Sequence, residues 1–295
     1  MSHTNENLMR SASYVSVGVA LILIIIKLAA YITTHSVALL ASLIDSFLDI
    51  AASTVNLIAI RHALTPADDE HRFGHGKAEP LAGLAQSAFI SGSALFLIVE
   101  AGDRLLHPVS IEHGAVGIIV MIVSTVLTVG LVWYQSYVVR KTGSVAISAD
   151  SLHYVGDVLA NLSIILALVL SVNFGWTMAD PVFAFAIAAY VLYSAWKIIR
   201  GSLDQLMDRE LPEEVRNQII EVAMSHPEVR NLHELRTRTS GHMTFIQMHL
   251  EMDRDISLLK AHTIADEVEQ ELYRMFPDSE VIIHEDPEGI EQMNS

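Results

Sequence analysis

Six stretches of the chain are almost wholly apolar, and each is long enough to cross a membrane as a helix. A helix needs about 20 apolar residues to span the hydrocarbon core of a bilayer. The stretches are separated by short polar or turn-forming segments and cover roughly residues 12–33, 37–60, 80–102, 114–138, 147–172 and 178–199. This pattern predicts an all-α bundle of six transmembrane helices.

The pattern changes after residue 208, where segments with apolar residues at helical spacing alternate with segments in which apolar and polar residues alternate as in a strand. The expected elements are a helix over 211–225, strands over 231–238 and 243–252, a helix over 257–275 and a strand over 280–284. This αββαβ order predicts a small α+β layer in which a helix pair covers a three-stranded sheet. We therefore expect two domains, a transmembrane domain over 1–208 and a soluble C-terminal domain over 209–295.

The composition agrees with a membrane protein. Hydrophobic residues make up 52% of the 295 residues and charged residues only 18%, whereas soluble proteins carry about 25% charged residues. The net charge of −16 argues against nucleic acid as a partner, because a nucleic-acid binder presents a basic face. The absence of cysteine from the sequence excludes disulfides, thiolate metal sites and cysteine nucleophiles.

Basic residues near the ends of the predicted spans indicate the orientation in the membrane. Lys and Arg concentrate in the cytoplasmic loops of membrane proteins. Arg104 lies on the side opposite the termini, and eight basic residues lie on the side of the termini: Arg10, Arg61, Arg72, Lys77, Arg140, Lys141, Lys197 and Arg200. We therefore expect both termini in the cytoplasm, together with the acidic C-terminal domain, which holds 19 acidic and 8 basic residues.

Two predicted spans carry ionisable residues, which are costly in a membrane and usually mark a pathway or a site. Asp45 and Asp49 are four residues apart in the second span, and His153 and Asp157 are four apart in the fifth. Each pair therefore projects from one helix face. If the two faces meet, one nitrogen and three oxygen donors suit a tetrahedral divalent ion such as zinc. A proton relay without metal is the alternative interpretation.

The loop after the second span offers a second group of possible ligands, Asp68, His71 and His75. A merely solvated polar loop is an equally good interpretation of this spacing. The nearby Gly-His-Gly-Lys segment, 74–77, lacks the glycine spacing and the Ser or Thr of a phosphate-binding loop. The sequence therefore shows no ATP site, and any transport would depend on a gradient.

The C-terminal domain holds a third group of possible ligands. Strand alternation places Ile246, Met248, Leu250 and Met252 on one face of the second strand and His249 on the other. Four ligands are expected to converge on the polar face of the sheet, with His262 from the second helix as a fifth candidate: His233, His249, His284 and Asp286. Solvated histidines, which we expect at 226 and 242, are the ordinary alternative.

These features together resemble the cation diffusion facilitator family over essentially the whole chain. The segments that carry the resemblance are Ser-Leu-Ile-Asp-Ser at 42–46, Phe-Gly-His-Gly-Lys-Ala-Glu at 73–79 and Asp-Ser-Leu-His-Tyr at 150–154. The resemblance implies a homodimer in the bacterial inner membrane that exports a divalent metal in exchange for protons. It also implies that the C-terminal domain has a metallochaperone-like fold.

The resemblance also assigns residues to roles. It implies a transport site at Asp45, Asp49, His153 and Asp157, and a loop site at Asp68, His71 and His75. It implies a binuclear site bridging two C-terminal domains, made by His233, His249, His262, His284 and Asp286. Finally, it implies a charge interlock between Lys77 and Asp208 near the membrane surface.

Zinc is the metal that we expect first, with cadmium and ferrous iron also accepted. An Asp3His site is richer in oxygen than the sites of strongly zinc-selective relatives, and the Irving–Williams order favours zinc over iron. Two other functions compete with transport. A membrane-anchored metal sensor would not need buried acids, and a proton-coupled carrier of organic solutes would not need the histidines of the C-terminal domain. An enzyme is not expected, because no nucleophile elbow or zinc-protease helix is present.

Overall fold

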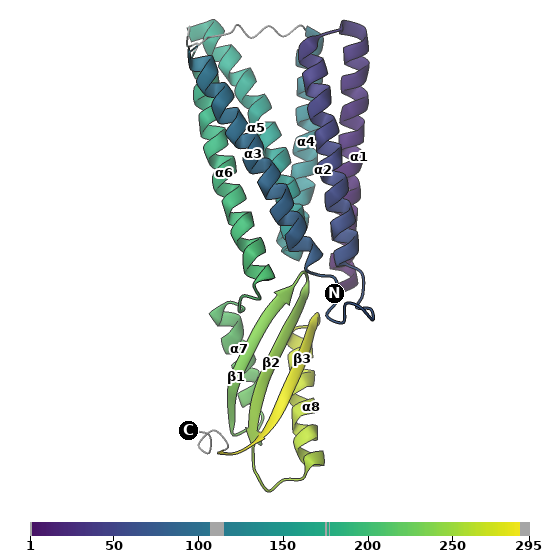
Figure 1. Cartoon of the computed structure of the whole chain (residues 1–295), viewed down its shortest axis with the longest axis vertical. Coiled ribbons are helices and arrows are strands. Elements are labelled where there is room, and N and C mark those ends of the chain that lie inside the picture. The colour runs from purple at the N-terminus through teal and green to yellow at the C-terminus, as the bar shows by residue number, and fades with distance from the viewer. Residues whose placement is uncertain (1, 107–114, 175, 177, 290–295) are drawn as a thin grey trace. The chain divides into compact units, whose positions relative to one another are not determined.

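The chain is described from a computed structural model over residues 2–106, 115–174, 176 and 178–289. Over these residues, six long helices form a bundle (Figure 1). They are α1 (Ser2–Thr34), α2 (Val37–Ala63), α3 (Ala78–Leu106), α4 (Ala115–Thr142), α5 (Val145–Phe174) and α6 (Ala179–Leu206). The bundle belongs to a compact unit, Asn5–Leu203, and a second unit begins at Asp204.

In the described part of the chain, five helices are long and apolar enough to cross a membrane, namely α1, α2, α3, α4 and α6. The remaining long helix, α5, is 30 residues long and carries the acidic and histidine residues of the fifth predicted span in its first half. Large apolar side chains face outward, as at Phe96 and Trp133, which are 70% and 73% exposed. Such a surface suits lipid rather than water. The predicted helical membrane bundle is therefore confirmed.

One helix end differs clearly from the prediction. Helix α1 begins at Ser2, whereas its apolar stretch begins near residue 12. Most of the residues before that stretch are polar, and none of them is Pro or Gly. Because nothing breaks the backbone hydrogen-bond ladder there, the helix continues beyond its apolar part.

Close packing in the bundle depends on a small residue in α3. A Cβ atom at Gly83 would lie 2.9 Å from both Ser202 Oγ on α6 and Val145 Cγ1 on α5. A side chain there would require these neighbouring side chains or their helices to move, because cores pack densely. The absence of a side chain at Gly83 therefore allows α3 to pack this closely against its two neighbours.

The second unit folds as the alternation predicts. Its elements are α7 (Glu213–Met224), β1 (Asn231–Ser240), β2 (Met243–Met252), α8 (Leu258–Met275) and β3 (Ser279–Pro287). Among the described residues these strands form one sheet in the order β1-β2-β3, with β1 antiparallel and β3 parallel to β2. The α+β layer is confirmed, and β3 is longer than predicted.

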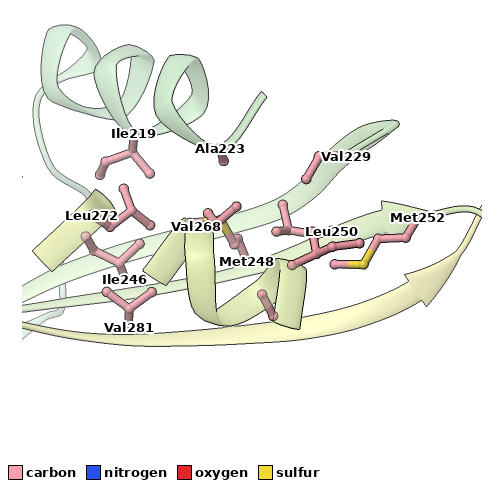
Figure 2. Close-up of a cluster of buried hydrophobic side chains, with 12 residues drawn as sticks. Ile219, Ala223, Val229, Ile246, Met248, Leu250, Met252, Val268, Leu272 and Val281 are labelled. Atoms are coloured by element: carbon pink, nitrogen blue, oxygen red, sulfur yellow. The ribbon is translucent and has the colours of Figure 1, made fainter. Parts of the chain in front are cut away.

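The core of this unit lies between the sheet and its two helices (Figure 2). Met248 and Leu250 of β2 are almost fully buried against Ile219 of α7 and Val268 and Leu272 of α8. Burial of an aliphatic side chain contributes roughly 1.5–3 kcal/mol to stability. Since both helices pack on this face, the polar residues of the strands lie together on the opposite face.

Candidate metal sites

Helices α2 and α5 bring an imidazole and two carboxylates together inside the bundle. The Nε2 atom of His153 lies 2.8 Å from Oδ1 of Asp49 and 3.8 Å from Oδ2 of Asp157. One possible ligand atom from each residue lies within 4.8 Å of the others. The side chains of His153 and Asp49 are only 10% and 13% exposed. This group has the donors and the spacing to hold a small divalent cation.

Asp45 does not belong to this group among the described residues. It lies one turn before Asp49 on α2 and is exposed. Lys27 of α1 lies beside this turn, where its Nζ donates to the Ser42 carbonyl at 3.1 Å and to the Ser46 hydroxyl at 2.7 Å. The ammonium group is near enough to Asp45, Asp49 and Asp157 to interact with them electrostatically.

A second polar cluster adjoins the first and holds the helices together. Asp150 on α5 is buried and accepts hydrogen bonds from Ser16 on α1 at 2.6 Å and Gln135 on α4 at 2.7 Å. It also accepts one from Ser53 on α2 at 3.2 Å. The serine and glutamine partners were not predicted, because isolated hydroxyls and amides in apolar helices have no diagnostic spacing. This cluster fixes α5 against α2, and so positions His153.

The loop between α2 and α3 brings its three predicted ligands together. Oδ2 of Asp68 lies 3.3 Å from Nε2 of His75, and Oδ1 lies 3.4 Å from Nδ1 of His71. Asp68 also accepts the backbone N–H groups of His71 at 2.7 Å and Glu70 at 3.0 Å. The N–H group of His71 is the main cause that lowers the pKa of Asp68 below its ordinary value. The carboxylate therefore stays ionised, as a metal ligand must.

Three histidines form a row across the polar face of the C-terminal sheet. The strand register pairs His233 with His249 and His249 with His284. Asp286 lies beside this row, with Oδ2 at 2.8 Å from Nδ1 of His249 and 3.2 Å from Nε2 of His233. Its Oδ1 lies 3.3 Å from Nε2 of His284. The structure therefore brings the four predicted ligands of this face together.

Glu251 is a further buried acid on this face. Its Oε1 lies 3.4 Å from Nδ1 of His233. The alternation that places His249 on the polar face also places Glu251 there, although it was not selected as a candidate ligand. A carboxylate in this position orients the ring of a histidine ligand.

The structure does not bring His262 to this cluster. His262 lies on α8, where its ring is 3.6 Å from Asp266 and 3.8 Å from Glu285, and its side chain is 66% exposed. Lys77 and Asp208, the predicted interlock pair, lie in different units, and their contact stays a prediction. Within its own unit, Asp208 accepts a hydrogen bond from Arg238 at 3.4 Å.

An apolar helical bundle with an acid–imidazole cluster inside it is an arrangement that suits a membrane transport protein. The chain matches the model of the cation efflux transmembrane domain over residues 13–207. Residues 211–288 match that of the cation efflux protein cytoplasmic domain. The chain therefore belongs to the cation diffusion facilitator family, whose members transport divalent metal cations and are not enzymes.

Several similar proteins carry the name cation-efflux pump FieF. The chain is 48% identical to that of Klebsiella pneumoniae over 290 residues, which is 98% of this chain and 96% of the relative. It is 49% identical to that of Escherichia fergusonii over 287 residues, which is 97% and 95% of the two chains. A solved cytosolic domain of a cation diffusion facilitator protein is 32% identical, with a TM-score of 0.25, over 26% of this chain and 92% of that one.

Proposed function

We propose that the protein exports zinc from the cytoplasm in exchange for protons, and that it also accepts cadmium and ferrous iron. The observation that carries this proposal is the group of His153, Asp49 and Asp157 inside the bundle. Relatives at 48–49% identity that are named cation-efflux pumps support the outward direction. Zinc ranks first because a mixed set of nitrogen and oxygen donors suits it.

Metal and proton compete for the same atom in this mechanism. Nε2 of His153 is the nitrogen that faces both Asp49 and Asp157. Metal binding needs a neutral imidazole and ionised carboxylates, so metal entry releases protons and proton entry releases metal. Imidazole suits this exchange because it ordinarily changes its charge between pH 5 and 8. A rearrangement of the bundle would expose the loaded site to each side of the membrane in turn.

Asp45 supplies the fourth ligand in this proposal. It is four residues from Asp49, so it lies on the same side of α2, and its exposed side chain has freedom to turn. The four ligands Asp45, Asp49, His153 and Asp157 would then form a closed tetrahedral site.

The row of histidines on the C-terminal sheet has a different role in the proposal. We assign it to a zinc site that stabilises a homodimer. His262 lies apart from the row in its own chain, which suits a site that two copies share. Metal bound between two copies would stabilise the dimer by mass action.

We further propose that the protein is a multi-pass protein of the bacterial inner membrane with both termini in the cytoplasm. The excess of basic residues on the side of the termini supports this orientation. In this arrangement the transport domain covers 1–208, the cytoplasmic domain covers 209–295, and Lys77 pairs with Asp208 near the membrane surface.

The test is zinc flux into sealed proteoliposomes under an imposed pH gradient, with Asp49→Ala beside the wild type. We expect zinc movement that follows the gradient and stops in Asp49→Ala. The matched control is Asp69→Ala, because Asp69 is exposed and lies outside the ligand groups of the described residues. Gradient-driven zinc flux that persists in Asp49→Ala would overturn the assignment of the site. Zinc binding without any flux in the wild type would favour a membrane-anchored sensor.

A further inference from the structure

A third imidazole lies beside the loop site and is not one of its predicted ligands. His62, in the last turn of α2, has its ring centroid 4.5 Å from that of His75, with the two planes at 61°. The ring centroid of His71 lies 4.7 Å from that of His75 as well. Three imidazoles and the Asp68 carboxylate therefore gather where α2 passes into the loop.

We propose that His62 is the fourth protein ligand of a divalent metal at the loop site, which becomes a closed site of one aspartate and three histidines. This inference rests on the proposed function, in that the loop must bind a metal. Zinc sites with four protein ligands are tetrahedral and exclude water, whereas sites with three protein ligands leave one position open. With Asp68, His71 and His75 alone, that position would be open to water.

The distances agree with tetrahedral coordination. Two ligand atoms at zinc–ligand distances of about 2.0–2.1 Å lie about 3.3 Å apart at the tetrahedral angle. Oδ2 of Asp68 and Nε2 of His75 are separated by 3.3 Å, and one possible ligand atom from each of Asp68, His71 and His75 lies within 4.8 Å of the others. Two imidazoles on one such ion have ring centroids about 5 Å apart, and small ring movements would bring His62 and His75 from 4.5 Å to that spacing.

The surroundings of His75 fix which of its nitrogens faces a metal. Its Nδ1 lies 3.3 Å from the carbonyl oxygen of Thr65, so an Nδ1–H group donates there and Nε2 is left as the ligand atom. A backbone carbonyl on the other ring nitrogen is the usual partner of a metal-bound histidine. The His75 side chain is 4% exposed, so the ring is held in place, while the exposed ring of His62 has room to turn toward the metal.

A fourth ligand from α2 would connect two sites of this protein. Asp49, in the transport site, and His62 belong to the same helix, and 13 residues of helix separate them by roughly 20 Å. Metal at the loop site would then clamp the loop directly to the helix that carries Asp49. With only the three loop ligands, the metal would leave that helix end unclamped.

The experiment is a titration of the full-length protein in detergent with Co²⁺ alone, followed by its visible absorption. Every protein in the experiment also carries Asp49→Ala and Asp286→Ala, which disrupt the other two groups of possible metal ligands. In that background we expect the strong absorption of tetrahedral Co²⁺. Because even the outer partners of metal ligands contribute about tenfold or more to affinity, His62→Ala should weaken binding at least about tenfold and reduce the absorption of each bound ion. His35→Ala is the control, because His35 lies at the other end of the bundle, beside Tyr31, and it should change neither quantity.

A fourth variant separates the two ways in which the proposal can fail. If His71→Ala leaves Co²⁺ binding unchanged, the loop holds no metal, and both the loop site and the role of His62 are wrong. If His71→Ala abolishes binding but His62→Ala changes neither the affinity nor the spectrum, the loop site stands and the role of His62 is wrong.

Discussion

His153 of α5 and Asp49 of α2 share a hydrogen bond between Nε2 and Oδ1, across 2.8 Å, inside the bundle. A metal ion at this site would need the same two atoms. In the proposed mechanism this bond has to break whenever metal enters, and it forms again when a proton replaces the metal.

Asp49→Asn tests this exchange with almost no change in shape. The amide oxygen still accepts a hydrogen bond from His153, so we expect the fold to be kept. The amide is neutral, however, and zinc needs ionised carboxylate ligands. We expect zinc affinity at the transport site to fall at least tenfold and gradient-driven flux to be lost. The measurements are zinc titration and flux in vesicles. Wild-type affinity in this variant would exclude Asp49 as a ligand.

Lys27 places an ammonium group beside the proposed transport site. A positive charge repels a divalent cation, so the lysine should weaken zinc binding and favour release. We expect Lys27→Met to bind zinc about tenfold more tightly, a change of about 1.4 kcal/mol, and to transport it more slowly. Calorimetric titration of zinc and vesicle flux check the two expectations. Lys27→Arg keeps the charge and should resemble the wild type, and weaker zinc binding by Lys27→Met would contradict this role.

Asp150 should matter for stability rather than for metal binding. Asp150→Ala removes the acceptor that Ser16, Ser53 and Gln135 share. Ser16 can still donate to Ser53, and Ser53 to Tyr154, so the buried amide of Gln135 is the donor that is left without a partner. Each buried unsatisfied donor costs about 1–3 kcal/mol.

We therefore expect thermal unfolding of Asp150→Ala in detergent at a temperature lower by more than about 4 °C. Asp150→Asn retains one acceptor oxygen and should lose less stability. Asp69→Ala, on the exposed loop, should unfold at the same temperature as the wild type. An unchanged unfolding temperature for Asp150→Ala would show that this cluster does not hold the helices together.

The row of histidines predicts a zinc-dependent dimer. His249 is the central member of the row and contacts Asp286, so His249→Ala should remove most of the zinc affinity of the C-terminal domain. We expect zinc to slow dissociation of the wild-type dimer, measured by subunit exchange between labelled proteins, but not that of His249→Ala. His226→Ala is a suitable control, because His226 pairs with Glu267 away from the row. Equal responses of both variants to zinc would contradict the assignment.

Local sequence spacing predicted most of the fold. Apolar length located the helices of the bundle, and alternation along β2 placed His249 opposite the buried Leu250, as the structure has it. Spacing of four residues also predicted that Asp49 lies near His153 and Asp157. These features follow from the residue periodicity of a single helix or strand, which can be read directly from the sequence.

Features that depend on several elements could not be predicted in this way. The position of Asp45 outside the central group depends on how α2 is rotated against α5, and the sequence of neither helix states that rotation. His262 lies on the helix that covers the apolar face of the sheet, so its distance from the row follows from the layering rather than from its spacing. The contact between His62 and His75 arises because the loop folds back on the end of α2.

The row of His233, His249 and His284 has a consequence for folding. Because side chains alternate along a strand, a slip of β2 by one residue would turn His249 toward the helices and separate the row. The histidine row therefore forms only when the strands pair in the correct register. An ion that required the whole row would bind only chains with correctly paired strands, and would therefore stabilise the correctly folded domain over misregistered ones.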